Sequence, residues 1–102
     1  MKNYDTPWTV GSMFICTKCG AAFDQPDNAE NLKKDLRGYL KEKDAHKKIR
    51  VMTSGCLNIC EKPEQAVMYQ PNNGATEIFT VEKKYSASLD ELKSVLNKKI
   101  GS

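Results

Sequence analysis

The four cysteines of this chain lie in two close pairs, and this pattern restricts the fold more than any other feature. Cys16 and Cys19 stand two residues apart in "FICTKC", and Cys56 and Cys60 stand with three residues between them in "SGCLNIC". Residues 20–55 separate the pairs, and the sequence has no other cysteine. A fold that gives all four thiols one role must therefore bring two distant segments together.

Length and composition indicate one globular domain. The chain has 102 residues, of which 39% are hydrophobic and 28% are charged, as in ordinary soluble domains. We expect residues 1–12 to form an irregular lead-in and residues 13–102 to form a single domain. No apolar run could span a membrane, and the N-terminus lacks the apolar stretch of a secretory signal. These features predict a cytoplasmic setting, where cysteines are more often metal ligands or redox groups than disulfides.

The distribution of charge is more informative than its total. A net charge of +3 is too small for a typical nucleic-acid-binding protein. Basic residues gather between Lys33 and Arg50, where eight Lys and Arg face three Asp and Glu. Two interpretations are open: a solvated helix face with internal ion pairs, or a docking surface for an acidic partner.

The spacing of apolar residues predicts six elements in the order β-α-β-β-β-α. Short apolar or alternating runs predict four strands, over residues 12–16, 48–54, 65–71 and 76–81. Apolar residues at helical spacing predict a helix of about four turns from Asn28, and a last helix that opens on a capping box at Ser88. The segment "NNG" at 72–74 is typical of a hairpin turn.

These elements predict a particular sheet. Two strands joined through a helix should be parallel neighbours with a right-handed crossover, and the hairpin adds antiparallel strands. The expected fold class is α/β (α+β), a four-stranded mixed sheet with flanking helices in a thioredoxin-like arrangement. Each cysteine pair follows one of the two parallel strands, so both pairs should emerge at the same edge of the sheet.

Three chemistries can use such a quartet of thiols. Zinc takes four thiolates in a tetrahedron, commonly from two Cys-x-x-Cys pairs, and only Cys16 and Cys19 have that spacing. A [2Fe–2S] cluster takes two thiolates on each iron and tolerates other spacings. A redox dithiol would use the first pair alone and leave the second without a role. The residues therefore favour a four-thiolate metal centre and leave the metal open.

With these residues identified, the chain resembles the thioredoxin-like [2Fe–2S] ferredoxins over roughly residues 13–100. The resemblance rests on "FICTKCG", on the following helix, on "VMTSGCLNIC", and on the hairpin and final helix. "SGCLNIC" is the most specific element. The spacing between Cys16 and Cys19 is shorter than is usual in that family, and the mildly basic charge is a second departure.

The resemblance implies a small one-electron carrier and not an enzyme. Cys16, Cys19, Cys56 and Cys60 would hold the [2Fe–2S] cluster, and zinc is the alternative metal. The expected partners are redox proteins of unknown identity, with no nucleic acid and no membrane, and a homodimer is left open. The rival functions are a zinc-stabilised protein-interaction module and, more weakly supported, a thiol–disulfide oxidoreductase.

Overall fold

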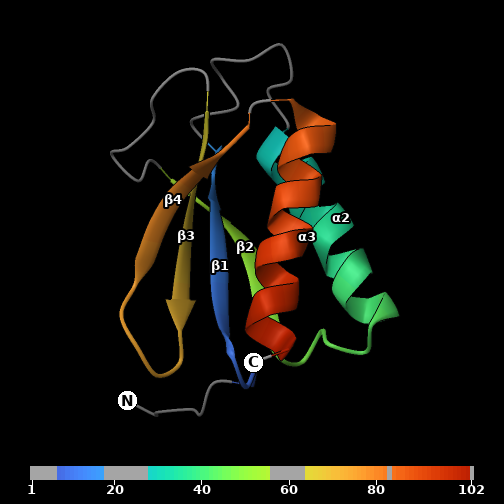
Figure 1. The fold of residues 1–102 in the computed structure, drawn as a ribbon, viewed down its shortest axis with the longest axis vertical. Helices are drawn as coiled ribbons and strands as arrows, with labels where there is room; N and C mark the ends of the chain where they lie inside the picture. The colour runs from blue at the N-terminus through green and yellow to red at the C-terminus, as the bar shows by residue number, and fades with distance from the viewer. Residues whose placement is uncertain (1–6, 18–27, 56–63, 83, 102) are drawn as a thin grey trace.

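A four-stranded mixed sheet organises the part of the chain that the computed structural model describes, residues 7–17, 28–55, 64–82 and 84–101 (Figure 1). The elements are β1 (Gly11–Cys16), α2 (Asn28–Glu42), β2 (Ile49–Ser54), β3 (Gln65–Pro71), β4 (Glu77–Val81) and α3 (Tyr85–Gly101). The strand order is β2-β1-β3-β4. β1 and β2 are parallel, while the β1–β3 and β3–β4 pairs are antiparallel. The predicted fold class, strand directions and element order are confirmed, and they are compatible with a thioredoxin-like arrangement.

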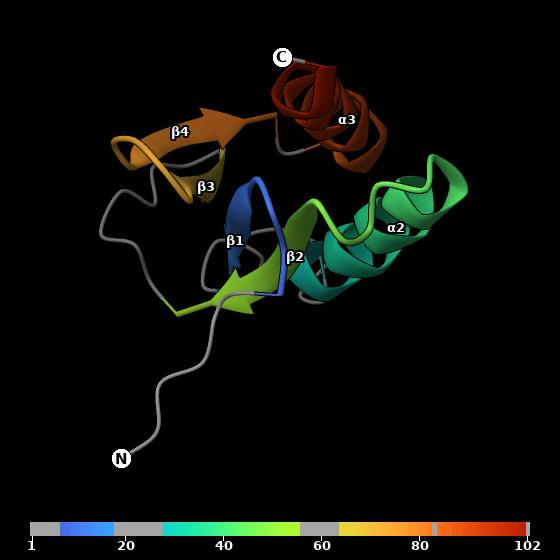
Figure 2. The ribbon, with the colours of Figure 1, turned by 90° about the horizontal axis from the view of Figure 1, so that it is seen from below.

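Both described helices pack on the same face of the sheet (Figure 2). Side chains alternate between the two faces of a strand, so Met13 and Ile15 of β1 face the helices. They join buried leucines of α2 and α3 and apolar residues of the other strands in one core cluster, which includes Leu32, Leu36, Leu40, Val51, Val67, Tyr69, Leu92 and Leu96. The apolar stripes predicted for the two helices therefore face the sheet.

The opposite face of the sheet carries an apolar row across all four strands. The strand registers place Phe14 beside Met52 of β2 and Met68 of β3, and Met68 beside Ile78 of β4. Ile78 is 51% exposed. Neither α2 nor α3 covers this row (Figure 2).

The helix α2 begins at Asn28, as predicted, and ends in a Schellman motif. The Ala45 N–H donates to the Leu40 carbonyl at 2.7 Å, and the Asp44 N–H donates to the Lys41 carbonyl at 3.1 Å. Asp44 has a φ of 56°, the left-handed conformation that this motif requires. Ala45 and Leu40 are both buried, which supplies the apolar contact that usually accompanies the motif.

The predicted start of the last helix at Ser88 is wrong. The helix α3 begins three residues earlier, at Tyr85, and the Ser88 N–H already donates to the Lys84 carbonyl at 2.9 Å. The Ser88 hydroxyl donates to the Tyr85 carbonyl at 2.9 Å, so it turns back into the helix instead of capping its first turn. Tyr85 packs on the core cluster, and this contact extends the helix beyond its local capping signal.

The starts of the strands agree closely with those predicted from the apolar and alternating runs of the sequence. β3 spans the predicted residues, while β1 starts one residue earlier than expected and β2 and β4 one residue later. Neither α2 nor α3 offers a stretch apolar and long enough to span a bilayer.

Candidate metal centre

The parallel strands β1 and β2 end side by side at the edge of the sheet from which the cysteine segments continue (Figure 1). Cys16, the last residue of β1, is paired with Ser54, the last residue of β2. Neighbouring strands lie about 4.8 Å apart. The Thr17 hydroxyl also donates to the Ser54 carbonyl at 2.9 Å. The chain therefore leaves the sheet toward Cys19 and toward Cys56 from adjacent points.

Of the four predicted ligands, the structure describes Cys16. Its side chain is 0% exposed, yet it is not a member of the core cluster. Alternation along β1 places it on the face opposite Met13 and Ile15 and thus away from the helices. Cys19, Cys56 and Cys60 lie outside the described residues, so a shared centre for the four thiols stays a prediction.

A buried amide fixes the end of β1. The Gln65 Nε2 donates to the Cys16 carbonyl at 2.8 Å and to the Ala66 carbonyl at 2.9 Å. The Asn28 Nδ2 donates to the Gln65 Oε1 at 3.0 Å, and both amide side chains are at most 1% exposed. These bonds link the end of β1 to the start of β3 directly and, through Gln65, to the start of α2, so the Cys16 carbonyl is held in a fixed position.

Sequence reasoning did not assign a role to Asn28 beyond capping, or any role to Gln65. Gln65 opens the apolar run "QAVMY", and a lone amide at a buried strand end needs hydrogen-bond partners. The sequence therefore already indicated that the Gln65 side chain needs a hydrogen-bond partner. Its partners are 37 and 49 residues away, so they become identifiable only once the strands are aligned.

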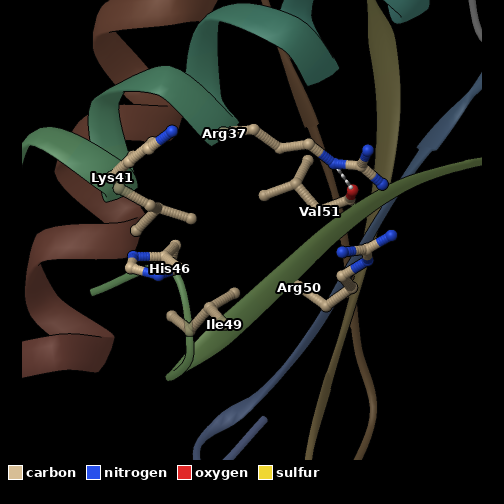
Figure 3. Close-up of a pocket in the computed structure, with 7 residues that line it drawn as sticks. Arg37, Lys41, His46, Ile49, Arg50 and Val51 are labelled. Atoms are coloured by element: carbon tan, nitrogen blue, oxygen red, sulfur yellow. Dashed lines mark hydrogen bonds between the residues drawn. The ribbon is translucent and has the colours of Figure 1, made fainter. Parts of the chain in front are cut away.

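The single histidine lies at the other end of β2. His46 is in the turn before Ile49 (Figure 3), whereas the cysteine segment follows Ser54. Among the described residues, no group of three or more His, Cys, Asp or Glu side chains is arranged to hold a metal ion.

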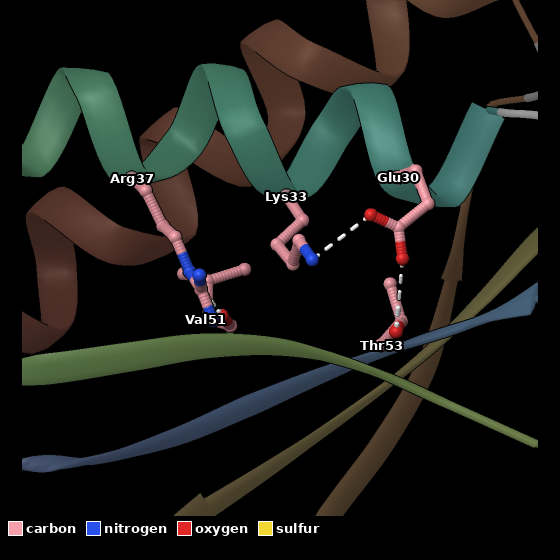
Figure 4. A network of polar contacts seen from close by, with 5 residues as sticks. All are labelled: Glu30, Lys33, Arg37, Val51 and Thr53. Atoms are coloured by element: carbon pink, nitrogen blue, oxygen red, sulfur yellow. Dashed lines mark hydrogen bonds and ion pairs between the residues drawn. The ribbon is translucent and has the colours of Figure 1, made fainter.

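Polar contacts hold the first turn of α2 against the end of β2 (Figure 4). Glu30 pairs with Lys33, with 2.9 Å between the Glu30 Oε2 and the Lys33 Nζ, and the Thr53 hydroxyl donates to the Glu30 Oε1 at 3.4 Å. The hydrogen bond from Lys33 is the main cause that lowers the pKa of Glu30. Through its contact with Thr53, Glu30 links the start of α2 to β2 beside the candidate site.

Comparisons with protein-family models, with curated proteins and with solved structures found no significant match for this chain. The relation to the thioredoxin-like ferredoxins therefore remains a resemblance in the residues and an expectation about function.

Proposed function

We propose that this protein is a small one-electron carrier that binds a [2Fe–2S] cluster through Cys16, Cys19, Cys56 and Cys60. The observation that carries the proposal is the pairing of Cys16 with Ser54, two residues before Cys56. That register starts both cysteine segments within about one strand spacing of each other. The proposal includes a cytoplasmic location, a redox protein as partner, and no catalytic residues.

The described residues at this edge fit such a centre. Cys16 supplies a thiol that is shielded from solvent and is not part of the main core cluster. Gln65 anchors the Cys16 backbone through its carbonyl, and Thr17 links the ends of the two parallel strands. A bound [2Fe–2S] cluster would supply reversible one-electron chemistry, with a potential set by ligand type, hydrogen bonding and burial. The contribution of the chain is to hold the strand ends in a fixed geometry and to exclude water from Cys16.

The burial of Cys16 argues against the dithiol alternative. A redox dithiol at Cys16 and Cys19 would use a reactive thiolate, and reactive cysteines are partly exposed in electropositive surroundings. Cys16 has no exposed surface. A permanently liganded thiol is compatible with that burial, whereas an attacking nucleophile is not.

Anaerobic purification with analysis of iron, zinc and acid-labile sulfide tests the proposal. We expect equal amounts of iron and sulfide, with visible absorption that bleaches on reduction by one electron. The double substitution Cys56→Ser and Cys60→Ser should abolish both iron and sulfide. Ser54→Ala, which alters the same edge without removing a thiol, is the matched control and should retain them.

Two outcomes would overturn this proposal in favour of its rivals. A colourless protein that holds stoichiometric zinc without sulfide would identify a zinc-stabilised interaction module. Thiol–disulfide exchange activity that survives the loss of Cys56 and Cys60 would identify an oxidoreductase that uses the first pair.

A further inference from the structure

A basic pocket lies at the outer edge of β2, between the second half of α2 and the turn that follows it (Figure 3). Its volume is about 310 Å³. Four of its lining residues are basic and three are buried apolar residues, and they comprise Arg37, Lys41, His46 and Arg50 together with Leu40, Ile49 and Val51. No carboxylate is among these lining residues. The apolar lining residues are at most 1% exposed, so the basic side chains form the accessible rim of the pocket.

The two arginines concentrate positive charge at this rim. Their guanidinium groups lie near one another over β2 in Figure 3, with Lys41 and His46 on the other side of the pocket. Burial is the main cause that lowers the pKa of Arg37, and the nearby charge of Arg50 lowers it further. The negative charge of Glu30 acts in the opposite direction and raises this pKa. Glu30 is already paired with Lys33 and bonded by Thr53. Glu30 therefore does not neutralise the positive charge of the two arginines, which can attract an external anion.

Positive charge is concentrated in the segment that forms the pocket. Residues 33–50 contain eight Lys and Arg against three Asp and Glu, whereas the rest of the chain has eight against ten. Of the three acids, Asp35 accepts a hydrogen bond from the Tyr85 hydroxyl on α3, and neither Glu42 nor Asp44 lines the pocket. This excess of basic residues favours a partner of opposite charge.

Arg37 lies against the edge of β2 beside the pocket. β2 is a terminal strand of the sheet, and the Arg37 Nε donates to the Val51 carbonyl at 2.8 Å, so that carbonyl points away from β1. The terminal nitrogens of Arg37 have no hydrogen-bond partner among the described residues and remain able to hold a carboxylate in a fork.

We propose that this pocket is a docking site for an extended acidic segment of a partner protein. Carboxylates of the segment would pair with the accessible basic side chains of the pocket, Arg37, Lys41 and Arg50. These side chains come from α2 and from β2, so the rim can take several carboxylates at once. A segment with more than one carboxylate would use this rim more fully than a single inorganic phosphate, which is why the observations favour a peptide. The inference does not depend on the presence of a cluster.

The test uses the full chain and a short fluorescein-labelled peptide of alternating glutamate and leucine, with binding followed by fluorescence anisotropy. We expect the peptide to bind and to shift the amide resonances of residues 37–51. The double substitution Lys41→Gln and Arg50→Gln should weaken binding at least tenfold. Both side chains are exposed, so this variant should fold. Lys84→Gln with Lys98→Gln removes the same charge from other exposed sites and should leave binding within about twofold.

Four outcomes would overturn the proposal. Equal weakening by the pocket pair and by the control pair would mean charge attraction without a site. Equal binding of a peptide with glutamine in place of glutamate would remove the electrostatic basis. Shifts of the same resonances by inorganic phosphate or by a single-stranded oligonucleotide, at concentrations where the peptide causes none, would assign the pocket to phosphate groups. The absence of any peptide binding at millimolar concentration would also contradict the proposal.

Discussion

Gly11 is required at the start of β1 because a neighbouring tyrosine approaches its backbone. A Cβ atom at residue 11 would lie 2.5 Å from the Tyr69 hydroxyl oxygen and 2.8 Å from the Gln70 carbonyl oxygen. Tyr69 is 1% exposed and its hydroxyl has no hydrogen-bond partner among the described residues. The Gln70 contact is with a backbone carbonyl in a paired strand. Rotation of a side chain alone therefore cannot relieve the clash.

We expect Gly11→Ala to lower the free energy of unfolding by about 1–3 kcal/mol, the usual cost of overpacking a closely packed site. Urea denaturation followed by circular dichroism measures the change. Gly38→Ala is the matched control, since a Cβ there would meet no atom within 4 Å. Alanine at this exposed helix position should raise the stability by about 1 kcal/mol. Equal effects of the two substitutions would show that close approach at Gly11 is unimportant.

These two glycines also show what the sequence cannot reveal about a single residue. The sequence pattern places Gly11 in the irregular lead-in, yet it is the first residue of β1. At Gly38 a Cβ would meet no atom within 4 Å, so this glycine is a weak point in the helix and not a site of close approach to the sheet. Local spacing does not determine which backbone atoms a neighbouring strand or helix approaches.

A non-glycine residue occupies a left-handed backbone conformation just after α2, and replacing it with glycine should stabilise the protein. Asp44 adopts a φ of 56°, a conformation that costs glycine little and other residues more. We expect Asp44→Gly to raise the free energy of unfolding by about 0.5–1 kcal/mol, measured by thermal or urea denaturation. Asp44→Asn removes the same charge but tolerates the conformation only partly, so it should have a smaller effect. An equal gain in both variants would assign the effect to charge instead.

The contact between α2 and α3 should make stability depend on alkaline pH. The Tyr85 hydroxyl donates to an Asp35 carboxylate oxygen. Burial, reinforced by Asp35, raises the pKa of Tyr85 above its ordinary value. Above about pH 10 the unfolded chain therefore releases a proton that the folded protein retains, so the free energy of unfolding falls as the pH rises. Tyr69 contributes in the same direction, because burial raises its pKa as well.

Tyr85→Phe should reduce stability near neutral pH by about 1 kcal/mol through the lost hydrogen bond, and it should flatten the decline above about pH 10. Urea denaturation at a series of pH values measures both effects. Asp35→Asn should keep part of the decline, since burial of Tyr85 persists. A decline of the same slope in Tyr85→Phe would show that other groups cause it.

At the scale of elements, periodic patterns predicted more than motifs did. Short apolar or alternating runs located the four strands to within a residue at their starts, because each strand buries one face against the helices. The capping box at Ser88 failed, because the contacts of Tyr85 with the core and with Asp35 extend α3 by almost one turn. Where a local capping motif and tertiary packing favour different first residues for a helix, the tertiary contacts determine where the helix begins.

At the scale of the whole molecule, topology accounts for the part of the candidate site that could be predicted. A parallel β1–β2 pair requires that the segments after Cys16 and Ser54 start at one edge, and the observed register satisfies this requirement. The Asn28–Gln65–Cys16 junction was not predictable, because its side chains come from elements far apart in the sequence. The basic stretch that contains Arg37 and Arg50 was recognisable as a possible docking surface, but the sequence did not show which of its side chains line one pocket.

The main core cluster does not include Cys16, and this arrangement predicts how the protein responds to metal removal. The core cluster joins the helices to the inner face of the sheet and contains no cysteine among the described residues. A zinc finger, by contrast, has little core of its own and unfolds without its metal. The metal-free form of this protein should therefore keep the sheet and both helices.

If the proposed cluster is present, its removal should lower the thermal midpoint by several degrees and leave the far-ultraviolet circular dichroism nearly unchanged. The centre would restrain the two strand ends, and each kcal/mol lost corresponds to about 4–8 °C for a domain of this size. Thermal denaturation before and after anaerobic chelation measures the shift. The Cys56→Ser and Cys60→Ser variant should melt at the metal-free temperature whether or not chelator is added. Loss of helical signal on chelation would instead mean that the buried leucines of α2 and α3 cannot hold the sheet and helices together without the metal.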